Sequence, residues 1–70
     1  MLPLNLAEPG EELIIKRVGG SPETKKHLED MGFTIGSEVS LISVLGGNGI
    51  VKVKDSRVAL SNELARRIMI

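Results

Sequence analysis

A chain of 70 residues without cysteine can build only a small domain, and it has neither disulfide bonds nor thiolate ligands for a metal ion. Nine Lys and Arg balance nine Asp and Glu, so the chain lacks the positive surplus that binding to nucleic-acid phosphates normally requires. Because it also has no Trp or Tyr and a single Phe, it offers no stacking platform for bases, and nucleic acid is not an expected partner.

The first strand is predicted over Glu12–Val18, after a turn at Glu8-Pro9-Gly10-Glu11. Aliphatic and β-branched residues dominate this run, which is typical of a strand. Gly19 and Gly20 end it.

One short helix is predicted between Ser21 and Gly32. Ser21 can cap the free amides of the first turn, and Pro22 suits the first helical position. Gly32 can adopt the left-handed conformation that ends a helix. Three residues fall at helical spacing on one face, which lets the helix lie on a sheet: Thr24, Leu28 and Met31. The next segment, Phe33–Gly36, is predicted to be a tight connection, with Phe33 buried beneath the helix.

The second strand is predicted over Val39–Leu45, and its alternation is imperfect. Val39 and Leu41 share one face, whereas Ile42 and Val44 share the other. This change of phase indicates a β-bulge or a strong bend, by which a sheet can curve into a barrel.

A turn at Gly46-Gly47-Asn48-Gly49 precedes a strand over Ile50–Lys54, in which Val51 and Val53 point inward and Lys52 and Lys54 point to solvent. The run of glycines lacks the Lys and Ser or Thr of a phosphate-binding loop and does not open a helix.

The remaining chain reads as a hairpin connection at Asp55-Ser56 and a strand over Arg57–Leu60. A single turn over Asn62–Ala65 follows, capped by Ser61, and a last strand over Ile68–Ile70 is predicted to pair with the first. Residues 1–70 are therefore expected to form one mainly β domain. We expect a small, partly open SH3-like barrel of about five antiparallel strands with one short inserted helix.

Catalytic chemistry has little support in this sequence. His27 is the only histidine, and no activated serine or paired base accompanies it, so no enzyme activity and no cofactor are expected. Glu23 lies four residues before His27, and such a pair could hold a transition ion weakly at a crystal or dimer contact. An ordinary pair of surface side chains explains these two residues better, and no metal site is predicted. Met31 and Met69 are expected to fill the core.

The order of these motifs resembles the ferrous-iron transport protein A family, also called FeoA-like domains. The resemblance rests on five segments in chain order: Leu4–Glu11, Val18–Gly20, Leu28–Val39, Val51–Leu60 and Leu64–Ile68. Two features depart from the family pattern. Ile35 stands where proline often precedes the glycine of the helix-exit turn, and Lys25, Lys26 and His27 occupy a region where arginines are common.

The resemblance implies an SH3-like barrel and a cytoplasmic accessory protein of ferrous-iron uptake. Its implied partner is the cytoplasmic GTP-binding part of a membrane ferrous-iron permease. The absence of cysteine fits a reducing cytoplasm, and no apolar run is long enough to span a membrane. Two alternatives remain open, namely the SH3-like domain of a metal-dependent transcription repressor and a small nucleic-acid-binding barrel. Self-association also remains open.

A non-catalytic barrel offers its loops and its helix surface to a partner. On this argument we expect Lys25, Glu29 and the turn at Phe33 to contact the partner protein.

Overall fold

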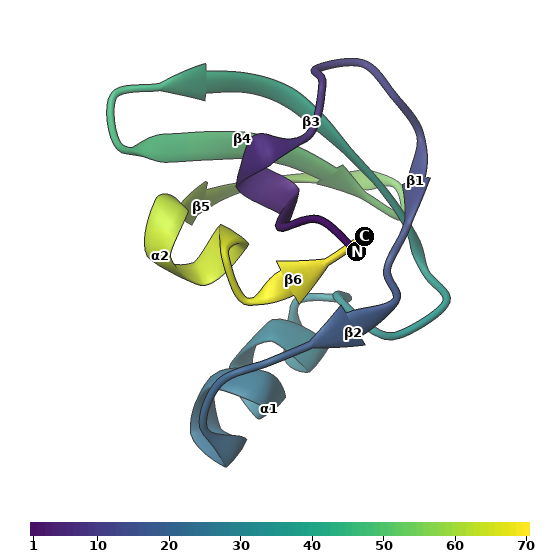
Figure 1. The fold of residues 1–70 in the computed structure, drawn as a ribbon, viewed down its shortest axis with the longest axis vertical. Helices are drawn as coiled ribbons and strands as arrows, with labels where there is room; N and C mark the ends of the chain where they lie inside the picture. The colour runs from purple at the N-terminus through teal and green to yellow at the C-terminus, as the bar shows by residue number, and fades with distance from the viewer.

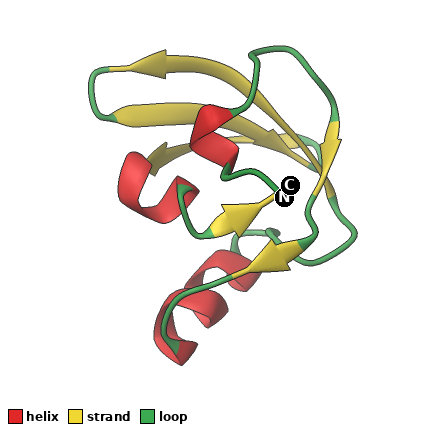
Figure 2. Cartoon of the chain, viewed as in Figure 1, coloured by secondary structure: helices red, strands yellow, loops and turns green.

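The computed structural model describes residues 1–70, and its strands curve around a shared interior (Figure 1; Figure 2). The elements in chain order are η1 (Leu4–Leu6), β1 (Leu13–Ile14), β2 (Arg17–Val18), α1 (Pro22–Asp30), β3 (Glu38–Leu45), β4 (Asn48–Val53), β5 (Ser56–Ser61), α2 (Asn62–Ala65) and β6 (Ile68–Met69). Four strands form an antiparallel sheet in the order β1-β3-β4-β5, and β2 pairs with β6 in a second sheet. The two termini lie side by side, because Leu2 and Ile70 exchange backbone hydrogen bonds.

The segment predicted as one strand, Glu12–Val18, is two short strands that belong to different sheets. β1 pairs with β3, whereas β2 pairs with β6. Between them, the Ile15 N–H donates to the Ser37 carbonyl at 3.0 Å, and the Ile15 carbonyl accepts from the Gly36 N–H at 2.8 Å. The prediction of a single strand was wrong because residue periodicity does not reveal a change of pairing partner.

The predicted helix is confirmed at its first turn. Ser21 has extended backbone angles, and its hydroxyl oxygen accepts a hydrogen bond from the Thr24 N–H at 3.2 Å. Pro22 occupies the first helical position, where a missing N–H costs nothing.

The end of α1 is a Schellman motif, which requires a left-handed residue just after the helix. Gly32 supplies it with φ = 101° and donates its N–H to the Glu29 carbonyl at 2.9 Å. The Phe33 N–H donates to the Leu28 carbonyl, also at 2.9 Å. Phe33 and Leu28 are both completely buried, so the motif fixes the chain direction and at the same time delivers the only aromatic ring to the core.

The predicted irregularity of the second strand is a β-bulge at Ile42. Leu41 pairs with Val51 and Ser43 pairs with Ile50, which leaves Ile42 as the extra residue on β3. A bulge increases local bending and twist, so β3 can curve from β1 toward the far end of the sheet.

Both hairpins have two-residue turns in which only the first central residue has a positive φ, the pattern of a type II′ turn. In the first hairpin this residue is Gly46, with φ = 62°. In the second it is Lys54, with φ = 55°, although the sequence had predicted Asp55-Ser56 as the connection. The turn is displaced by one residue because Val53 pairs directly with Ser56.

The last predicted elements are confirmed. The Ser61 hydroxyl accepts from the Leu64 N–H at 3.3 Å and caps α2, and β6 pairs with β2, the second half of the predicted first strand.

One cluster of thirteen buried apolar residues fills the interior: Leu4, Ala7, Ile15, Val18, Leu28, Phe33, Val39, Leu41, Val51, Val53, Leu60, Ile68 and Ile70. Met31 packs against it half-buried, whereas Met69 is half-buried and lies outside the cluster. The expectation that Met69 fills the core was therefore wrong, because β6 turns Ile68 inward and Met69 outward.

We expect Gly32→Ala to lower the free energy of unfolding by about 1–2 kcal/mol, because an L side chain is disfavoured at a left-handed position. A Cβ at Gly32 would meet only ordinary contacts at 3.7 Å, so the backbone conformation is the cause of the loss. Urea denaturation followed by circular dichroism measures the effect. Gly47→Ala is the matched control, since Gly47 has no positive φ and no neighbouring atom within 4 Å of a Cβ. Equal losses in the two variants would contradict this account.

Candidate contact surface

Large apolar side chains remain exposed on the segments next to the chain termini. Met1 is 77 % exposed, Leu2 42 %, Ile14 45 % and Ile35 71 %. Such side chains are unremarkable singly, but a group of them on one face indicates a surface that another molecule covers.

Backbone hydrogen bonds bring these segments together. The Leu2 N–H donates to the Ile70 carbonyl, the Lys16 N–H to the Met69 carbonyl at 2.7 Å, and the Gly36 N–H to the Ile15 carbonyl. The N-terminal segment, β6, the β1–β2 segment and the turn before β3 therefore lie next to one another. We use the name terminal face for four exposed apolar side chains of these segments and the half-buried Met69 beside them: Met1, Leu2, Ile14, Ile35 and Met69.

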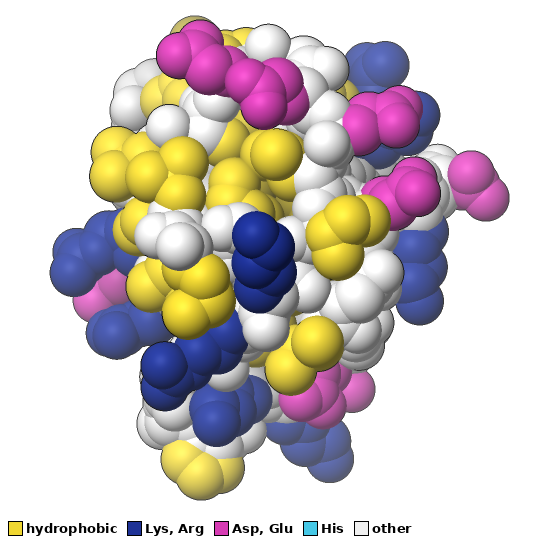
Figure 3. Space-filling view, turned by 45° about the vertical axis from the view of Figure 1, so that its right-hand side comes forward, with side chains coloured by type: hydrophobic (Ala, Val, Ile, Leu, Met, Phe, Trp, Pro, Cys, Tyr) yellow, Lys and Arg dark blue, Asp and Glu magenta, His cyan; other side chains and the backbone are white.

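Figure 3 shows hydrophobic side chains gathered over the side of the molecule that carries these segments. Lysine and arginine side chains border the apolar area in that view. Lys16 and Arg17 belong to the same backbone segments and are both exposed. The terminal face thus combines apolar area with positive charge.

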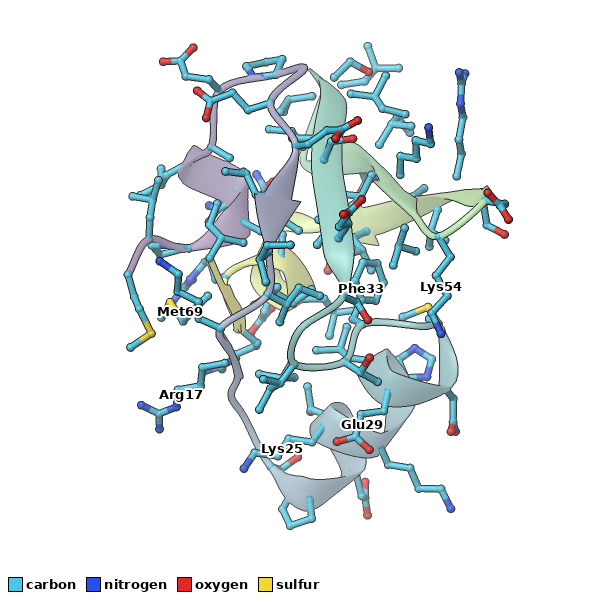
Figure 4. All side chains as sticks on the ribbon, turned by 90° about the vertical axis from the view of Figure 1, so that its right-hand side faces the viewer. Arg17, Lys25, Glu29, Phe33, Lys54 and Met69 are labelled. Atoms are coloured by element: carbon cyan, nitrogen blue, oxygen red, sulfur yellow. The ribbon has the colours of Figure 1, made fainter.

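The three residues predicted to contact a partner differ in accessibility. Lys25 and Glu29 are exposed and stand one turn apart on α1 (Figure 4). Phe33 is completely buried, so its ring offers nothing to a partner, in keeping with the prediction that it lies beneath the helix. The exposed apolar residue of that turn is Ile35, which sequence reasoning had noted only as a departure from a family pattern.

His27 and Glu23 are both exposed on α1, one helical turn apart. No group of three or more His, Cys, Asp or Glu side chains is placed to hold a metal ion. Two exposed donors on one helix leave a transition ion mostly hydrated, so any binding there is weak.

A shallow groove of about 420 Å³ crosses the outer face of the four-stranded sheet near the ends of β1, β3 and β4. All but one of its lining residues are polar or charged: Glu12, Ser37, Glu38, Val39, Ser40, Lys52, Lys54 and Asp55. Small-molecule sites are usually lined mainly by hydrophobic and aromatic side chains, whereas Val39 is the single hydrophobic residue in this groove.

No helix is long and apolar enough to cross a membrane. The fold and the terminal face define a small SH3-like barrel protein that exposes apolar side chains on one face. The FeoA domain model matches residues 2–70, and the chain belongs to that family.

Known proteins agree with this assignment. The chain is 36 % identical over 70 residues to the Methanocaldococcus jannaschii protein named "Putative Fe(2+) transport protein A". This alignment covers 100 % of the chain and 85 % of the relative. A crystal structure of an iron uptake regulatory protein, FeoA, superimposes with a TM-score of 0.87 at 26 % identity, over 96 % of this chain and 91 % of that one.

A further structural neighbour supports the fold alone. FeoA of Stenotrophomonas maltophilia, solved in complex with zinc and described as a prokaryotic SH3 domain protein, has a TM-score of 0.84 at 23 % identity. The match covers 99 % of this chain and 88 % of that one. The expected SH3-like class and the resemblance to FeoA-like domains are both confirmed.

We expect His27→Ala to leave both zinc binding and stability nearly unchanged, because the imidazole is exposed and lacks further ligands. Calorimetric titration with Zn²⁺ should give Kd values within threefold of each other for the wild type and the variant. The free energy of unfolding should change by less than about 0.5 kcal/mol. Lys26→Ala, at the neighbouring exposed position, is the control. A tenfold loss of zinc affinity in His27→Ala alone would assign His27 to a real metal site.

Proposed function

We propose that this protein is a cytoplasmic, non-catalytic accessory protein of ferrous-iron uptake. In this role it binds the cytoplasmic GTP-binding part of a membrane ferrous-iron permease. Membership of the FeoA domain family supports the proposal, as do the names of its relatives, which refer to Fe(2+) transport and to regulation of iron uptake.

The observation that carries the proposal is that a chain of this family leaves the apolar side chains of the terminal face exposed. A domain with only thirteen residues in its core gains stability from every apolar group it buries, yet it leaves Ile14 and Ile35 in solvent. Burial of these side chains in a complex would recover that free energy. The surface is therefore suited to a protein partner with an apolar contact area.

Positive charge beside the terminal face suits an acidic rim on that partner. Lys16, Arg17 and Lys25 are exposed on adjoining segments. Figure 4 shows Arg17 and Lys25 on the same side of the molecule, where β2 leads into α1. Lys25 and Glu29 belong to this proposed contact, and Ile35 replaces the Phe33 ring as its apolar contribution from the turn.

We expect Ile35→Glu and Ile14→Glu each to weaken binding to the purified cytoplasmic domain of the cognate permease by about tenfold or more. Full burial of an isoleucine side chain stabilises a complex by roughly 1.5–3 kcal/mol, and a buried carboxylate adds a further cost. Calorimetric titration with and without GTP measures the Kd.

Leu45→Glu is the matched control, because Leu45 is 76 % exposed but lies at the β3–β4 hairpin. It should bind like the wild type. If the wild-type protein fails to bind the domain in every nucleotide state, the proposed function is wrong. If it binds and Leu45→Glu is the damaging substitution, the terminal face is the wrong surface.

A further inference from the structure

β5 is an edge strand, since it ends the sheet order β1-β3-β4-β5. An edge strand presents unpaired backbone groups that can pair with another extended chain. β1, which carries Ile14 of the terminal face, stands at the other end of this order.

The register fixes which backbone groups of β5 are free. Val53 pairs with Ser56 across a two-residue turn, so these two residues exchange both hydrogen bonds. Bonded and non-bonded pairs then alternate along an antiparallel ladder, which turns the N–H and C=O groups of Arg57 and Ala59 away from β4. No backbone hydrogen bond outside the two sheets reaches either residue, and both are exposed. We call these four groups the β5 edge.

The β5 edge lacks most of the usual protection against pairing. β5 contains no proline, and its register with β4 is unbroken over six residue pairs, so no bulge twists the edge away. Ala59 is small and leaves room for a neighbouring strand. The one charge on this edge is Arg57.

Arg57 stands in an electrostatically unfavourable position. It lies directly opposite Lys52, and like charges opposite each other destabilise a sheet. The next residue across from Lys52 is Ser40. Carboxylates share the groove with Lys52, but no carboxylate stands beside Arg57 in the paired row. Asp55, in the adjoining turn, is the nearest acid along β5. An acidic side chain on the free side of β5, opposite Arg57 and away from Lys52, would reduce this repulsion.

We propose that the β5 edge binds an extended segment of a partner protein, with a glutamate or aspartate of that segment opposite Arg57. Backbone hydrogen bonds to Arg57 and Ala59 supply the affinity, and the cationic pair selects an acidic sequence. A second copy of this chain suits the edge less well, because it would bring another Lys52 and Arg57 into the same sheet.

The test uses the full-length ¹⁵N-labelled protein and a capped peptide of sequence Thr-Glu-Val-Glu-Thr. Two matched peptides carry Gln or Lys in place of both Glu residues. The acidic peptide should shift the amide resonances of Arg57 and Ala59 more than any others, and it should bind at least tenfold more tightly than the Gln peptide. No shift at either residue up to about 1 mM acidic peptide, or equal binding of the Lys peptide, overturns the proposal.

Two variants separate the backbone contribution from that of the charge. Ala59→Pro removes an outward N–H that the sheet does not use, so it should fold and lose peptide binding. Arg57→Glu should abolish the preference for the acidic peptide and raise the melting temperature by roughly 2–6 °C, because it replaces a like-charged pair by an opposite one. Lys26→Glu, an exposed charge reversal on α1, should leave binding unchanged. Retained acidic preference in Arg57→Glu would refute the assignment.

The peptide experiment does not involve the permease, so its failure would not contradict the proposed function. Failure to bind the permease domain would likewise not contradict peptide binding at the β5 edge. Light scattering identifies the competing occupant. A concentration-dependent dimer in which the Arg57 and Ala59 amides are protected without peptide would show that a second copy covers the edge, and would also overturn the proposal.

Discussion

The barrel depends on Ile15, where the chain leaves the larger sheet and enters the smaller one. Its two peptide groups bond to Ser37 and Gly36, whereas its side chain is 1 % exposed in the core. The residues before it pair with β3 and those after it with β6. At Ile15 the chain passes from one sheet to the other without an intervening helix, whereas its other two crossings, from β2 to β3 and from β5 to β6, contain α1 and α2.

The C-terminal end of α1 is the second feature on which the fold depends. It sets the direction of the following chain and packs Phe33 into the core. Gly32 allows the backbone to reverse, and the reversal places Phe33 against Leu28 inside the core. The same reversal starts the turn that bonds to Ile15 and exposes Ile35. The buried and exposed residues of this region therefore depend on one left-handed residue, which links the stability of the fold to the shape of the proposed contact surface.

Local signals in the sequence were sufficient for the helix and for the presence of the two hairpins, because caps, glycines and alternation act over a few residues. Ser21, Gly32 and the phase change near Ile42 all predicted what the structure contains. The division of the first strand depends on partners more than twenty residues away, and no local pattern encodes it. The turn at Lys54 was misplaced because a lysine with positive φ gives no sequence signal. Of the candidate site, Lys25 and Glu29 are accessible, but the terminal face is assembled from four separate segments and could not be predicted.

The burial of Phe33 as the sole aromatic side chain has a practical consequence for solution work. A single fluorinated phenylalanine would give one ¹⁹F resonance, located at the centre of the molecule and free of overlap. The rate at which that ring rotates about its axis would report how often the interior loosens enough to admit the motion. Binding of a ligand at the surface would then be detected as a change in the rotation rate of the Phe33 ring, without any label at the contact itself.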